Sequence, residues 1–105
     1  MINVQEYMNQ NYPKEERKNI TNLEINDKKL EGHLDLSDFV NLEELDCSEN
    51  ELTSIDLSNN RKIKLIDCSD NLLTDIDFSY QDHEKLEGIF IQDNNLSARS
   101  LSSFL

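Results

Sequence analysis

The chain has 105 residues, enough for one domain with one core, and its 22 acidic residues outnumber its 10 basic ones to give a formal net charge of −12. This charge argues against nucleic acid and against anionic membranes as partners, because both are bound mainly through Lys and Arg. No basic stretch precedes a long apolar run, so we expect neither a signal peptide nor a transmembrane helix. We therefore expect a soluble, cytoplasmic protein.

Residues 1–19 are predicted to form a helical cap at the N-terminal end. Val4 and Met8 recur at helical spacing, and Asn3 stands before them as a residue typical of helix N-caps. Pro13 is favoured at the start of a second, short helical turn.

Residues 20–97 carry an internal repeat. The segments LEELDCSENELTSIDLS (42–58) and IKLIDCSDNLLTDIDFS (63–79) agree at nine of seventeen positions, with a period of 21 residues. A later unit at 86–97 keeps the apolar spacing and the Asn, and an earlier unit at 22–37 is one residue longer. The repeat therefore predicts about four stacked coils, because one coil cannot bury its own apolar face.

The segments LEELDCSENEL and LEGIFIQDNNL resemble the leucine-rich-repeat signature, in which leucines at fixed spacing are followed by Asn and a further Leu. Asn50, Asn71 and Asn94 occupy the Asn position, whereas Lys28 replaces it in the first unit. The resemblance implies an α/β solenoid with short parallel strands on a concave face, few or short helices on the convex side, and an Asn ladder between coils. It also implies a non-catalytic protein-interaction module.

Each unit begins with an alternating segment that predicts a short strand with apolar side chains inward and polar ones outward. Cys47 and Cys68 fall at equivalent inward positions of neighbouring coils, and we expect both to be reduced core residues. A disulfide between them is not excluded by geometry, since adjacent strands lie about 4.8 Å apart. Six further apolar residues are expected to line the return side of the core: Leu52, Ile55, Leu57, Leu73, Ile76 and Phe78.

The sequence contains no recognisable catalytic or metal-binding motif. His33 and His83 lie in predicted loops of different coils without ligand spacing, so we expect both on the surface. The short loops offer no assembly of Ser, His and Asp, and we predict no enzymatic activity, no cofactor and no resident metal.

The acidic residues recur with the repeat and should form columns along the solenoid. Glu24, Asp46 and Asp67 are expected on the concave face, and two further columns are expected before the turn (Asp27, Glu49, Asp70, Asp93) and on the return side (Asp35, Asp56, Asp77). Stacked carboxylates repel one another, so a cationic partner would relieve them. The sequence leaves open that they only solubilise the protein, and calcium is a lesser alternative because it prefers a closed set of oxygens.

The outward positions of the strands predict a surface that binds a protein or peptide partner, with a basic one favoured. Aromatic residues carry much of the affinity of such surfaces, and Phe90 replaces the acid in the fourth coil, although a following coil or loop could instead cover it. The predicted contact residues are Glu44, Asp46, Ser48, Leu65, Asp67, Ser69 and Phe90.

Residues 98–105 are expected to be the truncated start of a further repeat or a C-terminal cap. Leu101, Phe104 and Leu105 follow at helical spacing without a polar residue to cover them. An alternative function follows from this end: the chain would be a structural capping or spacer fragment of a larger repeat protein, able to form a homodimer through its uncapped C-terminal end.

Overall fold

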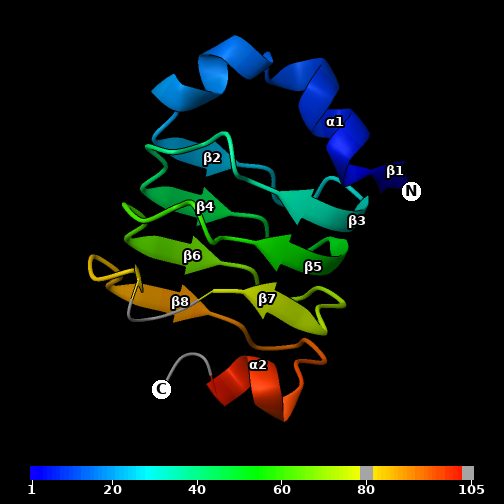
Figure 1. The fold of residues 1–105 in the computed structure, drawn as a ribbon. Helices are drawn as coiled ribbons and strands as arrows, with labels where there is room; N and C mark the ends of the chain where they lie inside the picture. The colour runs from blue at the N-terminus through cyan, green and yellow to red at the C-terminus, as the bar shows by residue number, and fades with distance from the viewer. Residues whose placement is uncertain (79–81, 103–105) are drawn as a thin grey trace.

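The computed structural model describes residues 1–78 and 82–102 and shows a solenoid of stacked parallel strands (Figure 1). Two four-stranded parallel sheets run along it. One contains β1 (Ile2–Asn3), β3 (Leu30–Asp35), β5 (Glu51–Asp56) and β7 (Asp75–Asp77), and the other contains β2 (Asn22–Glu24), β4 (Glu44–Asp46), β6 (Leu65–Asp67) and β8 (Gly88–Phe90). The predicted stacking of parallel strands is confirmed, with three turns between β2 and β8.

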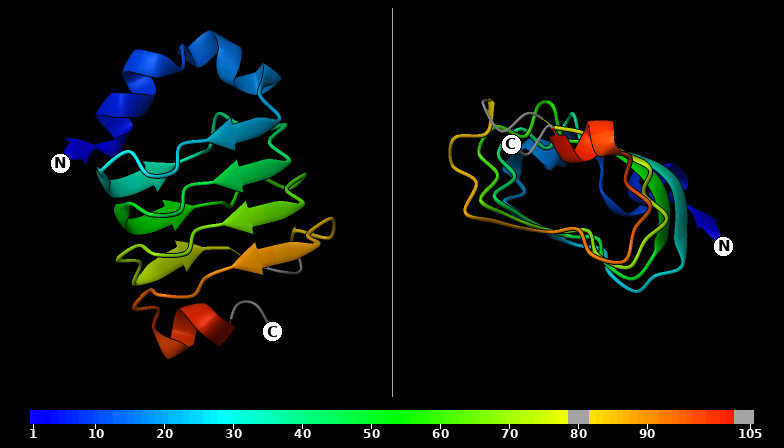
Figure 2. Two further views of the ribbon diagram at one scale, coloured as in Figure 1. Left: turned by 180° about the vertical axis from the view of Figure 1, so that it is seen from behind. Right: turned by 90° about the horizontal axis from the view of Figure 1, so that it is seen from below.

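The return side of the first three coils forms a second sheet, which the 21-residue pattern does not predict. Few helices are present, as expected, and the three at Val4–Asn11, Lys14–Asn19 and Ala98–Ser102 lie at the two ends of the stack (Figure 1). Seen along the stack, successive coils overlie one another and enclose the core between the two sheets (Figure 2).

A short motif occurs in both halves of the second coil, once in each sheet. In both halves an inward apolar residue is followed by an outward Asp, whose Oδ1 accepts hydrogen bonds from the Ser two residues later. Asp46 accepts from the Ser48 amide (3.0 Å) and hydroxyl (2.6 Å), and Asp56 accepts from the Ser58 amide (2.9 Å) and hydroxyl (2.6 Å). Both strands therefore end in the same type of side-chain-stabilised turn.

The core is a set of apolar columns that run through the stack. Leu34, Ile55 and Ile76 are paired in register on the return sheet and are at most 3% exposed. Cys47 and Cys68 are both 0% exposed and free, which confirms that they are core residues. Full burial of one such aliphatic side chain is worth about 1.5–3 kcal/mol, so the stacked columns supply much of the stability.

The Asn side chains form the ladder that the resemblance implies. The Nδ2 of Asn71 donates to the carbonyl of Cys68 in its own coil (3.2 Å) and to that of Cys47 in the preceding coil (3.0 Å). Its Oδ1 accepts from the amide of Leu52 (3.0 Å). Asn94 makes equivalent bonds one coil later. Each Asn thus satisfies backbone groups that no strand partner reaches.

The first coil has no Asn of its own at this turn, and its turn amides are bonded by an Asn of the next coil. The Oδ1 of Asn50, from the second coil, accepts from the amides of Lys28 (3.1 Å) and Leu30 (3.1 Å). Lys29 adopts a φ of 56°, which accommodates the extra residue of this unit, and the register then shifts at Gly32, which has a φ of 100°. The departure at Lys28 therefore changes the turn but leaves the stack intact.

The N-terminal end is covered by α1 (Val4–Asn11) and the 3₁₀ helix η1 (Lys14–Asn19), so the predicted helical segments are confirmed. The Oδ1 of Asn3 accepts from the amides of Gln5 (2.9 Å) and Glu6 (3.1 Å) and caps α1, and Pro13 precedes η1. The division of the chain into cap and repeats remains a prediction.

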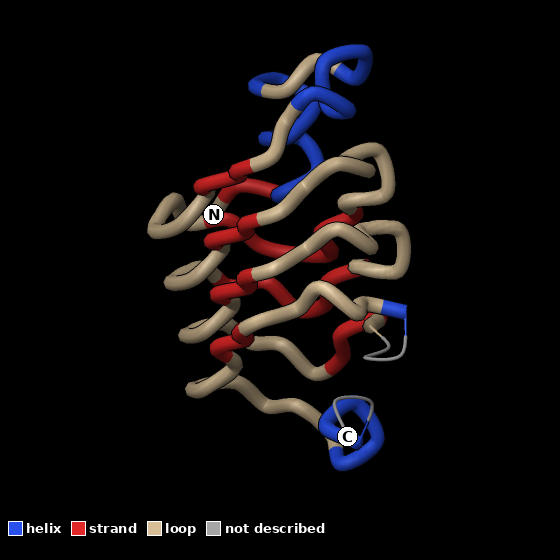
Figure 3. Tube along the Cα trace, turned by 90° about the vertical axis from the view of Figure 1, so that its left-hand side faces the viewer, coloured by secondary structure: helices blue, strands red, loops and turns tan. Residues whose placement is uncertain are grey.

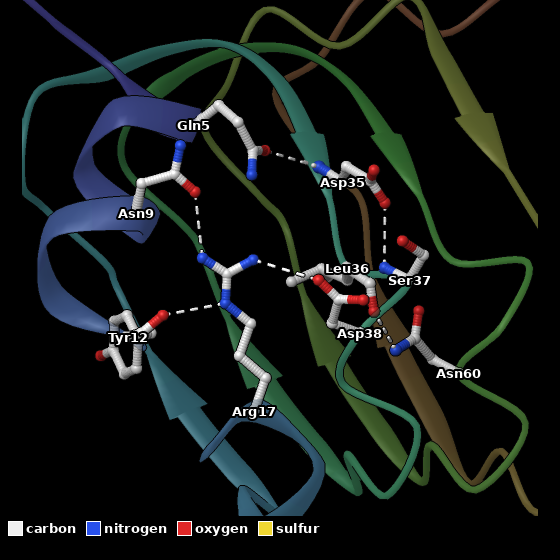
Figure 4. A network of polar contacts seen from close by, with 9 residues as sticks. All are labelled: Gln5, Asn9, Tyr12, Arg17, Asp35, Leu36, Ser37, Asp38 and Asn60. Carbon is white, nitrogen blue, oxygen red and sulfur yellow. Dashed lines mark hydrogen bonds and ion pairs between the residues drawn. The ribbon is translucent and has the colours of Figure 1, made fainter. Parts of the chain in front are cut away.

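Arg17 joins this cap to the first coil (Figure 4). It is only 4% exposed, and its guanidinium donates to the carbonyl of Tyr12 (2.9 Å), to Asn9 Oδ1 (3.1 Å) and to Asp38 Oδ2 (3.3 Å). Its Cζ also lies 5.5 Å from the centre of the Phe39 ring. The planar fork of donors suits such a site, and this role of Arg17 is not predicted from the sequence.

At the other end, α2 (Ala98–Ser102) packs beneath β7 (Figures 1 and 3). The Ser100 hydroxyl donates to Asp75 Oδ1 (2.6 Å). Leu101 is 43% exposed, whereas Phe104 and Leu105 lie outside the described residues. None of the described helices is long and apolar enough to cross a membrane.

The expectation that both histidines lie on the surface is wrong for His83. Its side chain is 1% exposed, stacks on Phe78 with ring centres 4.4 Å apart, and bonds the Leu57 carbonyl through Nε2 (2.7 Å). One coil earlier, Asn60 donates to the equivalent Leu36 carbonyl (3.0 Å). His83 is therefore a corner residue of the coil, because a carbonyl at this corner needs a donor.

Candidate functional site

The outward residues of β2, β4, β6 and β8 form two columns, which we call the acidic face. Parallel pairing sets them in register, so side chains of one column follow one another at the strand spacing of about 4.8 Å. One column contains Glu24, Asp46, Asp67 and Phe90, and the other contains Asn22, Glu44, Leu65 and Gly88. The face therefore holds four carboxylates beside two large apolar side chains.

The two central carboxylates are held in fixed orientations. Asp67 Oδ1 accepts from the Ser69 amide (3.1 Å) and hydroxyl (2.7 Å), as Asp46 does from Ser48. Ser48 and Ser69 are only 9% and 5% exposed, so they orient the carboxylates from below and offer little surface to a partner. The second oxygen of each carboxylate makes no hydrogen bond to the described residues and remains free for a donor.

Leu65 and Phe90 are exposed although both are apolar. Leu65 is 39% exposed and Phe90 48% exposed, both on the strands of the acidic face. Gly88 lies beside Leu65, and a Cβ added to it would come within 3.2 Å of Leu65 Cδ1. Leu65 thus occupies the space above Gly88, and the absence of a side chain there lets the two apolar residues frame one hollow.

This hollow has a volume of about 220 Å³ and gathers most of the predicted contact residues. Its lining comprises Asn22, Glu24, Glu44, Leu45, Asp46, Leu65, Asp67 and Phe90. Five of the seven predicted residues are therefore brought together, and only the two buried serines are not. Asn22, Glu24 and Leu45 are additions to the predicted contact residues. Glu24 was already expected on this face, and the strand register could have indicated Asn22, because it lies one coil before Glu44.

A second hollow, of about 390 Å³, lies elsewhere and contains none of the predicted residues. It is lined by Arg61, Asp82, Glu84 and Lys85, whose charges balance. Within residues 1–78 and 82–102, no three His, Cys, Asp or Glu side chains are grouped so that they could hold a metal ion.

The two cysteines are unsuited to chemistry at neutral pH. Burial raises the pKa of the Cys47 thiol well above its ordinary value, and the neighbouring Cys68 adds to the rise. Burial, followed by the charge of Asp67, raises the pKa of Cys68 to about 12. Because the thiolate is the reactive form, both side chains remain protonated and serve as small apolar residues.

A second acidic column follows the face along the turn that precedes each Asn. Its members adopt left-handed backbone angles, which is uncommon for residues other than Gly: φ is 52° at Asp27, 55° at Glu49, 56° at Asp70 and 59° at Asp93. Loss of hydration, followed by the carboxylate of Asp93, raises the pKa of Asp70. The carboxylates of this column extend the negative charge of the acidic face towards its turn, and Asp70 is the member whose ionised form is disfavoured.

Comparison of the chain with protein families, with curated proteins and with solved structures finds no match in any of the three. The function must therefore be argued from the geometry of the acidic face.

Proposed function

We propose that the chain is a non-catalytic interaction module that binds a basic protein or peptide through the acidic face. The observation that carries the proposal is the single hollow in which Asp46 and Asp67 lie beside the exposed Leu65 and Phe90. Exposed apolar side chains surrounded by charges are typical of binding surfaces.

Charge and apolar area would have separate roles in binding. Two carboxylates at about 4–5 Å repel by roughly 1 kcal/mol even in water, so a Lys or Arg of a partner relieves the column while it pairs with it. Phe90 and Leu65 supply the area that becomes buried, at about 25 cal/mol per Å². The carboxylates would thus set the choice of partner and the association rate, while the apolar pair slows dissociation.

We further propose that the chain is a short leucine-rich-repeat protein in the sense that the sequence resemblance implies. The Asn ladder supports this kinship, since Asn50, Asn71 and Asn94 all bridge successive coils. The sheet on the return side is compatible with units of 21 residues, which leave little chain for a long helix.

The test compares two double variants of equal charge. Asp46→Asn/Asp67→Asn removes two charges from the acidic face and keeps Oδ1 as the acceptor for Ser48 and Ser69. Asp56→Asn/Asp77→Asn removes two charges from the other sheet, where Asp56 makes the same turn. Partners retained by the wild-type chain would be purified and titrated against all three proteins at two salt concentrations.

We expect the acidic-face variant to lose affinity about tenfold and to show a weaker salt dependence, while the control stays within about twofold of the wild type. Phe90→Ala should also weaken binding and leave the unfolding midpoint nearly unchanged, because the ring is half exposed. Equal affinity of the two double variants for every captured partner would exclude the acidic face as the binding surface.

Self-association through the C-terminal end is the second candidate, and the exposure of Leu101 (43%) favours it. Light scattering over a wide concentration range tests it directly. A mass that rises with concentration and returns to that of the monomer in Leu101→Ser would support it, whereas a constant monomer mass removes it.

A further inference from the structure

The last strand of the sheet that carries the acidic face has an open edge. In each coil the outward residues direct their amides towards the preceding coil, as Gly88 does to the Lys64 carbonyl (3.2 Å) and Leu65 to the Glu43 carbonyl (3.1 Å). Alternate residues point the other way, so Ile89 directs its amide and carbonyl away from β6. No described residue lies on that side to receive them.

The preceding coil shows how many groups this edge leaves unpaired. The amides of Cys68, Asp70 and Asn71 donate to carbonyls of the fourth coil at 3.0–3.2 Å. The equivalent amides of the fourth coil belong to Ile91, Asp93 and Asn94, and none of them has an acceptor among the described residues.

Apolar side chains are left partly uncovered at the same edge. Ile66 and Cys68 are 0% exposed because the fourth coil covers them, whereas their counterparts Ile89 and Ile91 are only half-buried. The helix α2 does not complete this coverage, since it packs beneath β7 on the other sheet (Figure 1). The edge of β8 thus combines free backbone groups with apolar surface, which is what an added strand requires.

Charge indicates which strand would fit. Exposed carboxylates of Glu87 and Asp93 flank β8 at its two ends, and Asp67 precedes Phe90 in the outward column. A Lys or Arg beside Phe90 could also contact the face of its ring. A second copy of the chain would bring a further net charge of −12 to this edge, so charge complementarity favours a basic segment of another protein.

We propose that the chain binds its partner by strand addition: an extended basic segment, alternating apolar and Lys or Arg residues, pairs in parallel with the edge of β8. Its apolar side chains cover Ile89 and Ile91, and its basic side chains extend the outward column beyond Phe90. This inference rests on the proposed function, since it states how a basic partner engages the acidic face.

The test uses the whole chain and a heptapeptide of alternating lysine and valine. If the peptide extends the stack, its outward lysines direct their amides to β8 and its valines direct theirs away. N-methylation of the lysine amides should therefore weaken binding about tenfold or more, while N-methylation of the valine amides should change it by less than about twofold. A glutamate–valine peptide is the charge control and should not bind.

Amide hydrogen exchange gives a second readout that needs no variant. Saturating peptide should slow exchange at Ile89 and Ile91 by about tenfold or more, whereas the Cys68 amide, already bonded to the Phe90 carbonyl (3.0 Å), should change little. Exchange protection that is confined to the interior of the acidic face would overturn strand addition.

The remaining outcomes separate this inference from the proposed function. Suppose that Asp46→Asn/Asp67→Asn weakens peptide binding but that neither N-methylation changes the affinity. The acidic face would then remain the binding surface, and strand addition would be wrong. If the lysine–valine peptide does not bind, strand addition is also wrong. The proposed function would still be tested by the affinities of the captured partners for the two double variants. If the Ile89 and Ile91 amides exchange slowly in the chain without peptide, and more slowly as the protein concentration rises, a second copy of the chain and not a basic segment occupies the edge.

Discussion

The side-chain amide of Asn71 bonds the carbonyl of Cys47 in the preceding coil at 3.0 Å, and so ties one coil to the next. Its Oδ1 also accepts from the buried amide of Leu52 (3.0 Å). Asn71→Ala should therefore lower the free energy of unfolding by about 3 kcal/mol, because it leaves buried backbone groups of two coils without partners. Urea unfolding followed by circular dichroism measures this loss.

Asn95→Ala is the matched control, because Asn95 is exposed and only its backbone takes part in the stack, through the Leu73 carbonyl (2.9 Å). We expect a change within about 0.5 kcal/mol for this variant. Similar losses in Asn71→Ala and Asn95→Ala would mean that the ladder does not contribute to stability.

Replacement of His83 by Asn should destabilise the chain less than replacement by Ala, because Asn60 donates to the equivalent carbonyl one coil earlier. His83→Ala removes the bond to the Leu57 carbonyl and the stacking on Phe78, and we expect it to cost about 2 kcal/mol. His83→Asn should recover roughly half of this loss, as Asn60 Nδ2 bonds the equivalent Leu36 carbonyl. Thermal unfolding of the wild type and the two variants tests this order of stability. An Asn variant that is no more stable than the Ala variant would contradict it.

Much of the stacked core could be predicted from the sequence because the repeat fixes it. The identity between the units around Cys47 and Cys68 gives both the period and the inward positions. The 21-residue period alone does not predict the second sheet, because within it the Asp and Ser around Asp56 are only one part of a longer unit. This pattern of Asp and Ser recurs about every half coil, from Asp35 to Asp77, and that shorter period indicates two strands per coil.

The acidic face was predictable in its composition but not in its shape. Alternation places Asp46, Asp67 and Phe90 outward, and the register confirms that they share one column. The roles of Arg17 and His83 could not be predicted, since Arg17 pairs with the carboxylate of Asp38 and His83 with the carbonyl of Leu57, both more than 20 residues away in the chain. Contacts of this kind appear only when the coils are stacked.

The thiols of Cys47 and Cys68 should be unreactive in the folded chain. Both are 0% exposed, and burial raises the pKa of Cys68 to about 12, so almost no thiolate forms between pH 7 and about pH 9. A chromogenic disulfide reagent should therefore label neither thiol within minutes under native conditions and both in concentrated urea. Rapid labelling of the folded chain would contradict the inward placement of this column, and with it the outward placement of Asp46 and Asp67.

Asp70→Asn should stabilise the chain at neutral pH. The folded state raises the pKa of Asp70, through loss of hydration and then through Asp93, so ionisation of this carboxyl opposes folding. Above the raised pKa the carboxyl is charged in both states and the penalty is complete; below the unfolded value of about 3.9 it is neutral in both and the penalty vanishes. Asn also tolerates the left-handed backbone found here, where φ is 56°.

The stabilising effect of Asp70→Asn should accordingly be largest near pH 7 and should shrink as the pH falls towards about 3.5, leaving only the part due to the backbone. Urea unfolding at both pH values separates the two parts, because the backbone preference does not titrate. Glu84→Gln removes one charge away from the column and controls for the change in net charge. If Asp70→Asn were no more stable than this control at pH 7, repulsion between Asp70 and Asp93 would not limit folding. The turn column would then contribute nothing to the need for a cationic partner.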